Sequence, residues 1–214
     1  MNAIETEMPV SAVTTREWRA TRIQSFSNLD LQLSRRLDWR FLLGDTLLGN
    51  VAYIGKEKPF LVAGLEKFSD RLTTVGSKTS ETLPANFDLA VVTSATVAAF
   101  VSAAGILKDA GSVYVEIGSA GVKAKLVGLK GYRTALLAAG FQDVRAYWHR
   151  PNFEACREIV PLDDATTLDY VLSRQHADFA GKVKTTAARF ATKAGLLSFI
   201  LPSISLIACK PSQG

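Results

Sequence analysis

The chain has 214 residues, 48% of them hydrophobic, which is enough to bury one sizeable core. Its net charge of +5 and pI near 9.3 favour acidic partners, but so small an excess specifies neither nucleic acid nor anionic lipid. Cys156 and Cys209 have no C-x-x-C spacing, which argues against a zinc site or a disulfide framework. Residues 1–10 lack the features of a secretory signal, so we expect a cytoplasmic protein without a metal site.

The amino-terminal region mixes apolar residues with arginines. We expect a mobile tail over residues 1–13 and one or two amphipathic helices over 14–37. One role for these helices is to hold a protein partner.

A tryptophan stands between opposite charges just before the first predicted strand. In a functional interpretation, Arg40 binds an anion and Trp39 stacks on a ligand ring. In a structural one, Asp38 caps a turn, Arg40 pairs with a nearby acid and Trp39 covers the sheet edge. The sequence leaves both open.

Apolar runs then alternate with helical stretches along the centre of the chain. Such alternation predicts parallel strands in a three-layer α/β sandwich. Ligands bind beyond the carboxyl ends of such strands, so function is expected near Gly55, residues 93–95, residues 117–120 and His149. The predicted strands are 51–55, 71–75, 87–92, 112–117 and 141–148, and the predicted helices are 60–68, 93–107 and 132–139.

The last quarter of the chain contains an uncharged stretch at residues 194–209. It is too short for a membrane span and is interrupted by Pro202 and three serines, so we expect a buried final strand at 203–210. Before it, residues 151–201 are expected to form a helical lid, with helices at 165–173 and in the basic segment 181–193. Peripheral membrane contact through that basic segment is an alternative.

Three phrases in the centre of the chain resemble a known family. F-D-L-A-V-V at 87–92, L-K-D-A-G-S-V-Y-V at 107–115 and L-L-A-A-G-F-Q-D-V at 136–144 are similar to the second half of class I S-adenosylmethionine-dependent methyltransferases. In that family the fourth strand begins F-D, the fifth follows L-K-P-G-G, and a helix ending A-G-F precedes the sixth. Here D-A-G replaces P-G-G. The resemblance covers roughly residues 50–150 and the last strand.

This resemblance implies a Rossmann-like sandwich, mostly parallel, with a central antiparallel last strand. Residues 78–86 are too few for the usual helix and third strand, so that side of the sheet is expected to be reduced. The implied organisation is an amino-terminal cap at 1–45, a core at 46–150, a lid at 151–201 and a final strand with its tail at 202–214.

The resemblance also implies S-adenosylmethionine as cofactor, but two of the family's determinants are absent from their positions. A G-x-G-x-G loop would follow strand one, where only Gly55 remains, and an acid would follow strand two, where Gly76 stands. The cofactor is therefore expected to bind in a non-standard way around Gly55, Lys56, Thr93 and Ser94. Lys56 and Lys58 could instead attract a phosphate at the start of the next helix, or form a solvated turn.

Few side chains offer acid–base chemistry. His149 is a candidate base, or a strand-end histidine bonded to a backbone carbonyl. Glu116 either faces the cleft or points outward, and Arg150 either binds a phosphate or carboxylate of the substrate or is simply exposed.

The sequence therefore predicts a methyltransferase-fold enzyme for a small molecule, such as a sugar or a specialised metabolite. The alternatives are another reaction in the same cleft, or a non-catalytic protein that binds a partner through residues 14–36 or 181–193.

Overall fold

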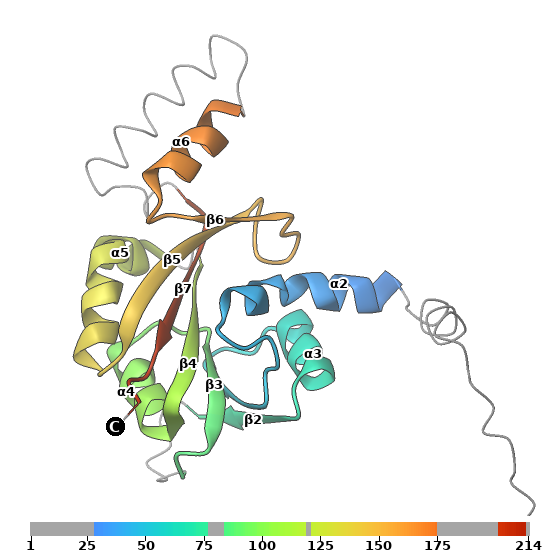
Figure 1. Cartoon of the computed structure of the whole chain (residues 1–214), viewed down its shortest axis with the longest axis vertical. Helices are drawn as coiled ribbons and strands as arrows, with labels where there is room; N and C mark the ends of the chain where they lie inside the picture. The colour runs from blue at the N-terminus through green and yellow to red at the C-terminus, as the bar shows by residue number, and fades with distance from the viewer. Residues whose placement is uncertain (1–27, 77–83, 119–120, 175–200, 213–214) are drawn as a thin grey trace, which may run out of the picture. The chain divides into compact units, whose positions relative to one another are not determined.

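A computed structural model describes residues 28–76, 84–118, 121–174 and 201–212 (Figure 1). The predicted tail, most of the amphipathic segment 14–37, residues 77–83 of the reduced third-strand region and the basic segment 181–193 lie outside the described residues.

The described strands form one sheet in the order β2-β1-β3-β4-β7-β5-β6. Strands β2, β1, β3 and β4 are parallel, and β7 lies antiparallel between β4 and β5. This is the arrangement that the resemblance implies, so the predicted class I methyltransferase fold is confirmed. The strands are β1 Asn50–Ile54, β2 Arg71–Val75, β3 Phe87–Val92, β4 Leu107–Gly118, β5 Gln142–Arg150, β6 Glu158–Pro161 and β7 Ser203–Cys209.

Helices cover both faces of the sheet (Figure 1). On one face lie α4 (Val97–Ile106) and α5 (Gly121–Ala138), and on the other lie the end of α2 (Asn28–Arg36) from Leu33 on, the 3-10 helix η1 (Asp38–Leu42) and α3 (Pro59–Phe68). Because successive side chains of a strand point to opposite faces, Ala52 and Ile54 belong to one core and Val51 and Tyr53 to the other. This two-sided burial explains the nearly continuous apolar runs of the central strands.

Helix α5 begins at Gly121, well before the predicted residue 132. Three further elements differ from the sequence prediction. Helix α4 begins only at Val97, because the side chain of Thr96 caps it by accepting a hydrogen bond from the Ala99 N–H at 3.2 Å. Strand β4 begins at Leu107 and passes through residues 108–111, where Ala110 has a φ of 61° and the register with β3 shifts.

The third difference is β6. It pairs with β5 inside the stretch predicted to be a helical lid, and α6 (Ala165–Arg174) follows it and packs against it.

The turn after β1 is attached to the end of β3. The Lys56 N–H donates to Ser94 Oγ at 3.2 Å, and Thr93 Oγ1 donates to the Lys56 carbonyl at 2.8 Å. The Tyr53 hydroxyl donates to the same carbonyl at 2.7 Å. Gly55 makes this approach possible with a φ of 121°, since a Cβ there would lie 2.7 Å from the Ser94 nitrogen.

We expect the Gly55→Ala substitution to destabilise the protein by about 1–3 kcal/mol, because alanine is strained at this φ and its methyl would strike backbone. Urea unfolding measures the change. Gly105→Ala is the matched control: a Cβ there meets nothing within 4 Å, so stability should change by less than about 1 kcal/mol. Equal stability of the two variants would contradict the close approach of the turn to β3.

Candidate functional site

A buried ionic group occupies the carboxyl end of β4. Glu116 and Tyr114, two residues apart on this strand, point to the face covered by α2 and α3. Glu116 Oε1 accepts a hydrogen bond from Arg36 Nη2 at 2.7 Å and another from the Tyr114 hydroxyl at 3.2 Å, and Oε2 accepts from Lys58 Nζ at 2.7 Å. We call these four residues the edge cluster.

The edge cluster holds two positive charges against one negative charge. The side chains of Arg36 and Glu116 are 2% and 0% exposed, whereas that of Lys58 is 31% exposed. Burial alone would raise the pKa of Glu116, but Arg36 and Lys58 outweigh it and hold this pKa below its usual value. Glu116 is therefore a carboxylate fixed by two cations rather than a free base.

His149 lies near the edge cluster but is also buried. Its Nε2 shares a hydrogen bond with Ser205 Oγ at 2.8 Å, and its Nδ1 lies 3.6 Å from the Cys156 sulfur. Burial lowers the pKa of His149 from 6.5 to about 4, although the charge of Glu116 opposes this shift. The imidazole is therefore neutral at pH 7, and its partner is a side-chain hydroxyl rather than the backbone carbonyl considered from the sequence.

The Tyr114 ring of the edge cluster contacts the rings of Trp39 and His149. Trp39 stacks on Tyr114 with ring centroids 3.8 Å apart and an angle of 9°, and Tyr114 meets His149 edge to face at 6.4 Å. The structure thus brings together the predicted Glu116, His149 and Trp39. Trp39 is 1% exposed, so its ring contacts protein rather than solvent.

The two predicted anion-binding arginines lie outside this group. Arg40 stands over the rings of Phe41 and Phe68 at 4.7 and 5.0 Å. Arg150 pairs with Glu158 across the β5–β6 ladder at 2.7 Å. Their substrate-binding roles stay predictions that these contacts do not favour.

Arg36, Tyr114 and Phe153 were missed by the sequence analysis. The Phe153 ring lies 5.5 Å from the Arg36 guanidinium and 5.2 Å from Lys58 Nζ. The arginine-rich segment before residue 37 was the only signal for Arg36, whereas Lys58 stood in the lysine turn already singled out.

The predicted cofactor residues Gly55, Lys56, Thr93 and Ser94 do come together, at the ends of β1 and β3. However, both backbone groups of Lys56 are bonded to the hydroxyls of Thr93 and Ser94, and Gly76 follows β2, where the family that the chain resembles carries an acid. The residues present therefore do not fit S-adenosylmethionine in the way usual for the fold.

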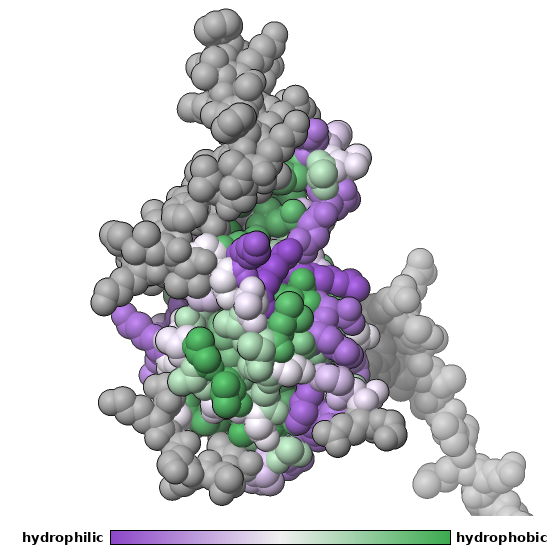
Figure 2. Space-filling model, turned by 90° about the vertical axis from the view of Figure 1, so that its left-hand side faces the viewer, coloured by the Kyte–Doolittle hydropathy of each residue, from purple (hydrophilic) through white to green (hydrophobic). Residues whose placement is uncertain are grey.

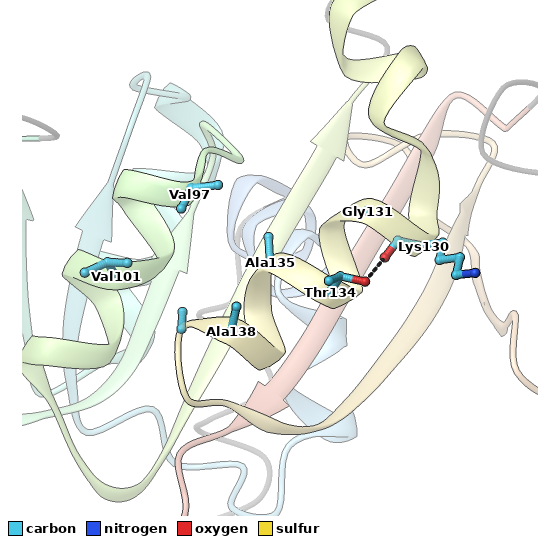
Figure 3. Close-up of a pocket in the computed structure, with 8 residues that line it drawn as sticks. Val97, Val101, Lys130, Gly131, Thr134, Ala135 and Ala138 are labelled. Atoms are coloured by element: carbon cyan, nitrogen blue, oxygen red, sulfur yellow. Dashed lines mark hydrogen bonds between the residues drawn. The ribbon is translucent and has the colours of Figure 1, made fainter.

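A hollow of about 570 Å³ lies between α4 and α5. Figure 3 shows residues that line it, and it lies on a side where hydrophobic side chains gather (Figure 2). The only titratable residue lining it is Lys130, so it offers no acid–base chemistry. Its lining residues are Val97, Val101, Lys130, Gly131, Thr134, Ala135, Ala138 and Ala139.

The described residues contain no group of three or more His, Cys, Asp or Glu side chains that could hold a metal ion. None of their helices has the length and apolar character needed to cross a membrane.

No family model matches the chain, and no curated protein matches its sequence. Among solved structures, phosphoethanolamine N-methyltransferase 2 of Haemonchus contortus, in complex with S-adenosyl-L-methionine, is similar with a TM-score of 0.48 and 14% identity, covering 84% of this chain and 53% of that one. A SAM-dependent methyltransferase from Archaeoglobus fulgidus has a TM-score of 0.47 and 11% identity, covering 92% and 100%.

A possible histamine N-methyltransferase from Thermotoga maritima has a TM-score of 0.45 and 11% identity, covering 91% of this chain and 95% of that one. The chain spans about half the length of the Haemonchus enzymes. Likeness this distant says nothing about the reaction.

We expect Glu116→Gln to destabilise the protein by about 3 kcal/mol or more, because it leaves the buried Arg36 charge without its anion. Urea unfolding at pH 7 measures the loss. Glu57→Gln, an exposed change in the neighbouring turn, should stay within about 0.5 kcal/mol of wild type. A Glu116→Gln variant as stable as the control would show that the pair contributes nothing.

The stability of the fold should fall as the pH drops from 7 to 5. In this range the unfolded chain protonates His149, with a pKa of 6.5, whereas the folded chain, with a pKa of about 4, does not. The unfolded state then binds more protons, so His149 lowers the free energy of unfolding by about 2 kcal/mol at pH 5.

Urea unfolding of wild type and of a His149→Asn variant at both pH values isolates this contribution. The low pKa of Glu116 acts in the same direction but is common to both proteins. Parallel pH profiles for the two proteins would contradict the expectation.

Proposed function

We propose that the chain is a methyltransferase-fold protein that binds a small molecule at the carboxyl edge of its parallel strands and no longer transfers a methyl group from S-adenosylmethionine. The observation that carries this proposal is the attachment of the turn after β1 to Thr93 and Ser94. It places protein groups where the fold usually receives its cofactor.

The position of the turn adds support to the proposal. Strand β1 has β2 on one side and β3 on the other, so the chain changes direction across the sheet between β1 and β3. Ligands of open α/β sheets bind in the crevice at such a switch point. Here Lys56 crosses that crevice, and the Tyr53 hydroxyl supports its carbonyl from the strand below.

The chemistry of the edge supports the same proposal. A general base must come within hydrogen-bond reach of the proton that it removes. Glu116 already accepts bonds from two cations, and His149 is 2% exposed with its ring nitrogens next to Ser205 and Cys156. We infer that Glu116 positions the two cations and that His149 maintains the packing beneath them.

The second candidate is a methyltransferase that binds S-adenosylmethionine non-conventionally and methylates a sugar or a specialised metabolite. It is favoured by the partly exposed position of Gly55, Thr93 and Ser94 at the end of β1 and β3. Methyl transfer there would depend on holding the two reactants in line rather than on a base. A protein partner at residues 14–36 stays a prediction.

Isothermal titration with S-adenosylmethionine and S-adenosylhomocysteine separates the two candidates. We expect no binding of either compound at 1 mM, because the crevice is bridged by the protein itself. A Ser94→Ala variant, which removes the bond to the Lys56 N–H, serves as a check that the bridge is responsible. Micromolar binding to the wild-type protein would overturn the proposal and favour the second candidate.

A further inference from the structure

We infer that the edge cluster binds an anionic group, a phosphate or a carboxylate, carried by its small-molecule ligand. The inference rests on the proposed function in one respect only, namely that a small molecule binds at this edge. It names the chemical class of that molecule.

Unpaired donors on Arg36 are the first support. Its guanidinium is buried, and Nη2 donates to Glu116, while Nε and Nη1 have no hydrogen-bond partner among the described residues. Within the same part of the chain, the Nε1 atom of Trp39, whose ring stacks on Tyr114, is likewise buried without a hydrogen-bond partner. Buried donors without acceptors are costly and therefore rare, so this arrangement calls for an acceptor from outside the protein.

The charge balance gives the second support. Arg36 and Lys58 carry two positive charges and Glu116 one negative charge, while burial raises the pKa of Tyr114 well above its usual value, so its hydroxyl is neutral. The remaining acid whose charge acts on Arg36 is Glu154, which is exposed. One further negative charge would neutralise the edge cluster.

The geometry of the cations suits an oxyanion. A guanidinium offers its donors as a planar fork that matches a carboxylate or a phosphate, and an ammonium adds a point charge. Lys58 is the exposed member of the edge cluster, so a ligand would approach from its side. The Phe153 ring lies against both cations and would form the apolar wall of the site.

Inorganic phosphate and acetate are suitable probes, because they present the phosphate group and the carboxylate group without the rest of a ligand. Isothermal titration at constant ionic strength, with sodium chloride as the balancing salt, measures their affinity. Lys58→Met removes the exposed cation and leaves the Arg36–Glu116 pair intact. Lys130→Met removes an exposed lysine from α5 and is the matched control.

We expect Lys58→Met to weaken phosphate binding about tenfold or more, as the loss of one charge-assisted hydrogen bond predicts, and Lys130→Met to leave it unchanged. Arg36→Lys keeps the charge but removes the fork, so it should also weaken binding. Stronger binding of acetate than of phosphate would identify a carboxylate ligand. Absence of binding by both probes, or equal effects of Lys58→Met and Lys130→Met, would overturn the inference. Titration with S-adenosylmethionine tests the proposed function separately.

Discussion

The contact between Arg36 and Glu116 is the constraint on which the site depends. The two residues lie 80 positions apart in the sequence, and their pairing attaches the end of α2 to the end of β4. Buried ion pairs often stabilise a fold no more than well-packed apolar side chains of similar volume do, so this pair at the carboxyl edge of the sheet suggests a role other than stability. Lys58, which follows the turn after β1, also contacts Glu116 and is partly exposed to solvent.

The fold and the contacts at its edge are separate features of this chain. The sheet of this chain keeps the order and directions of the methyltransferase fold, yet the polar groups at its carboxyl edge are bonded to one another. Function resides in such a site rather than in the fold that carries it. A protein can therefore retain the scaffold while the groups at its ligand-binding edge change.

Most of the sheet could be predicted from the sequence, because strands that are buried on both faces consist of short runs of apolar residues, as in β1 and β3. The start of β4 could not be predicted, because the residues around the bulge at Ala110 have the composition of a loop. Glu116 and His149 were found from their positions at strand ends. Arg36 was not, because a contact with a residue 80 positions away along the chain leaves no local pattern. Tyr114 was not singled out either, although it stands two residues before Glu116 on the same face of β4.

The position of Arg36 has a consequence for where this protein can be divided. A cut placed just before β1, at the start of the Rossmann-like core, would release the guanidinium and leave a carboxylate enclosed in apolar surroundings beside a single lysine. Residues 36–49 are therefore part of the folded unit, and a version that begins after Arg36 should be less stable than one that retains it.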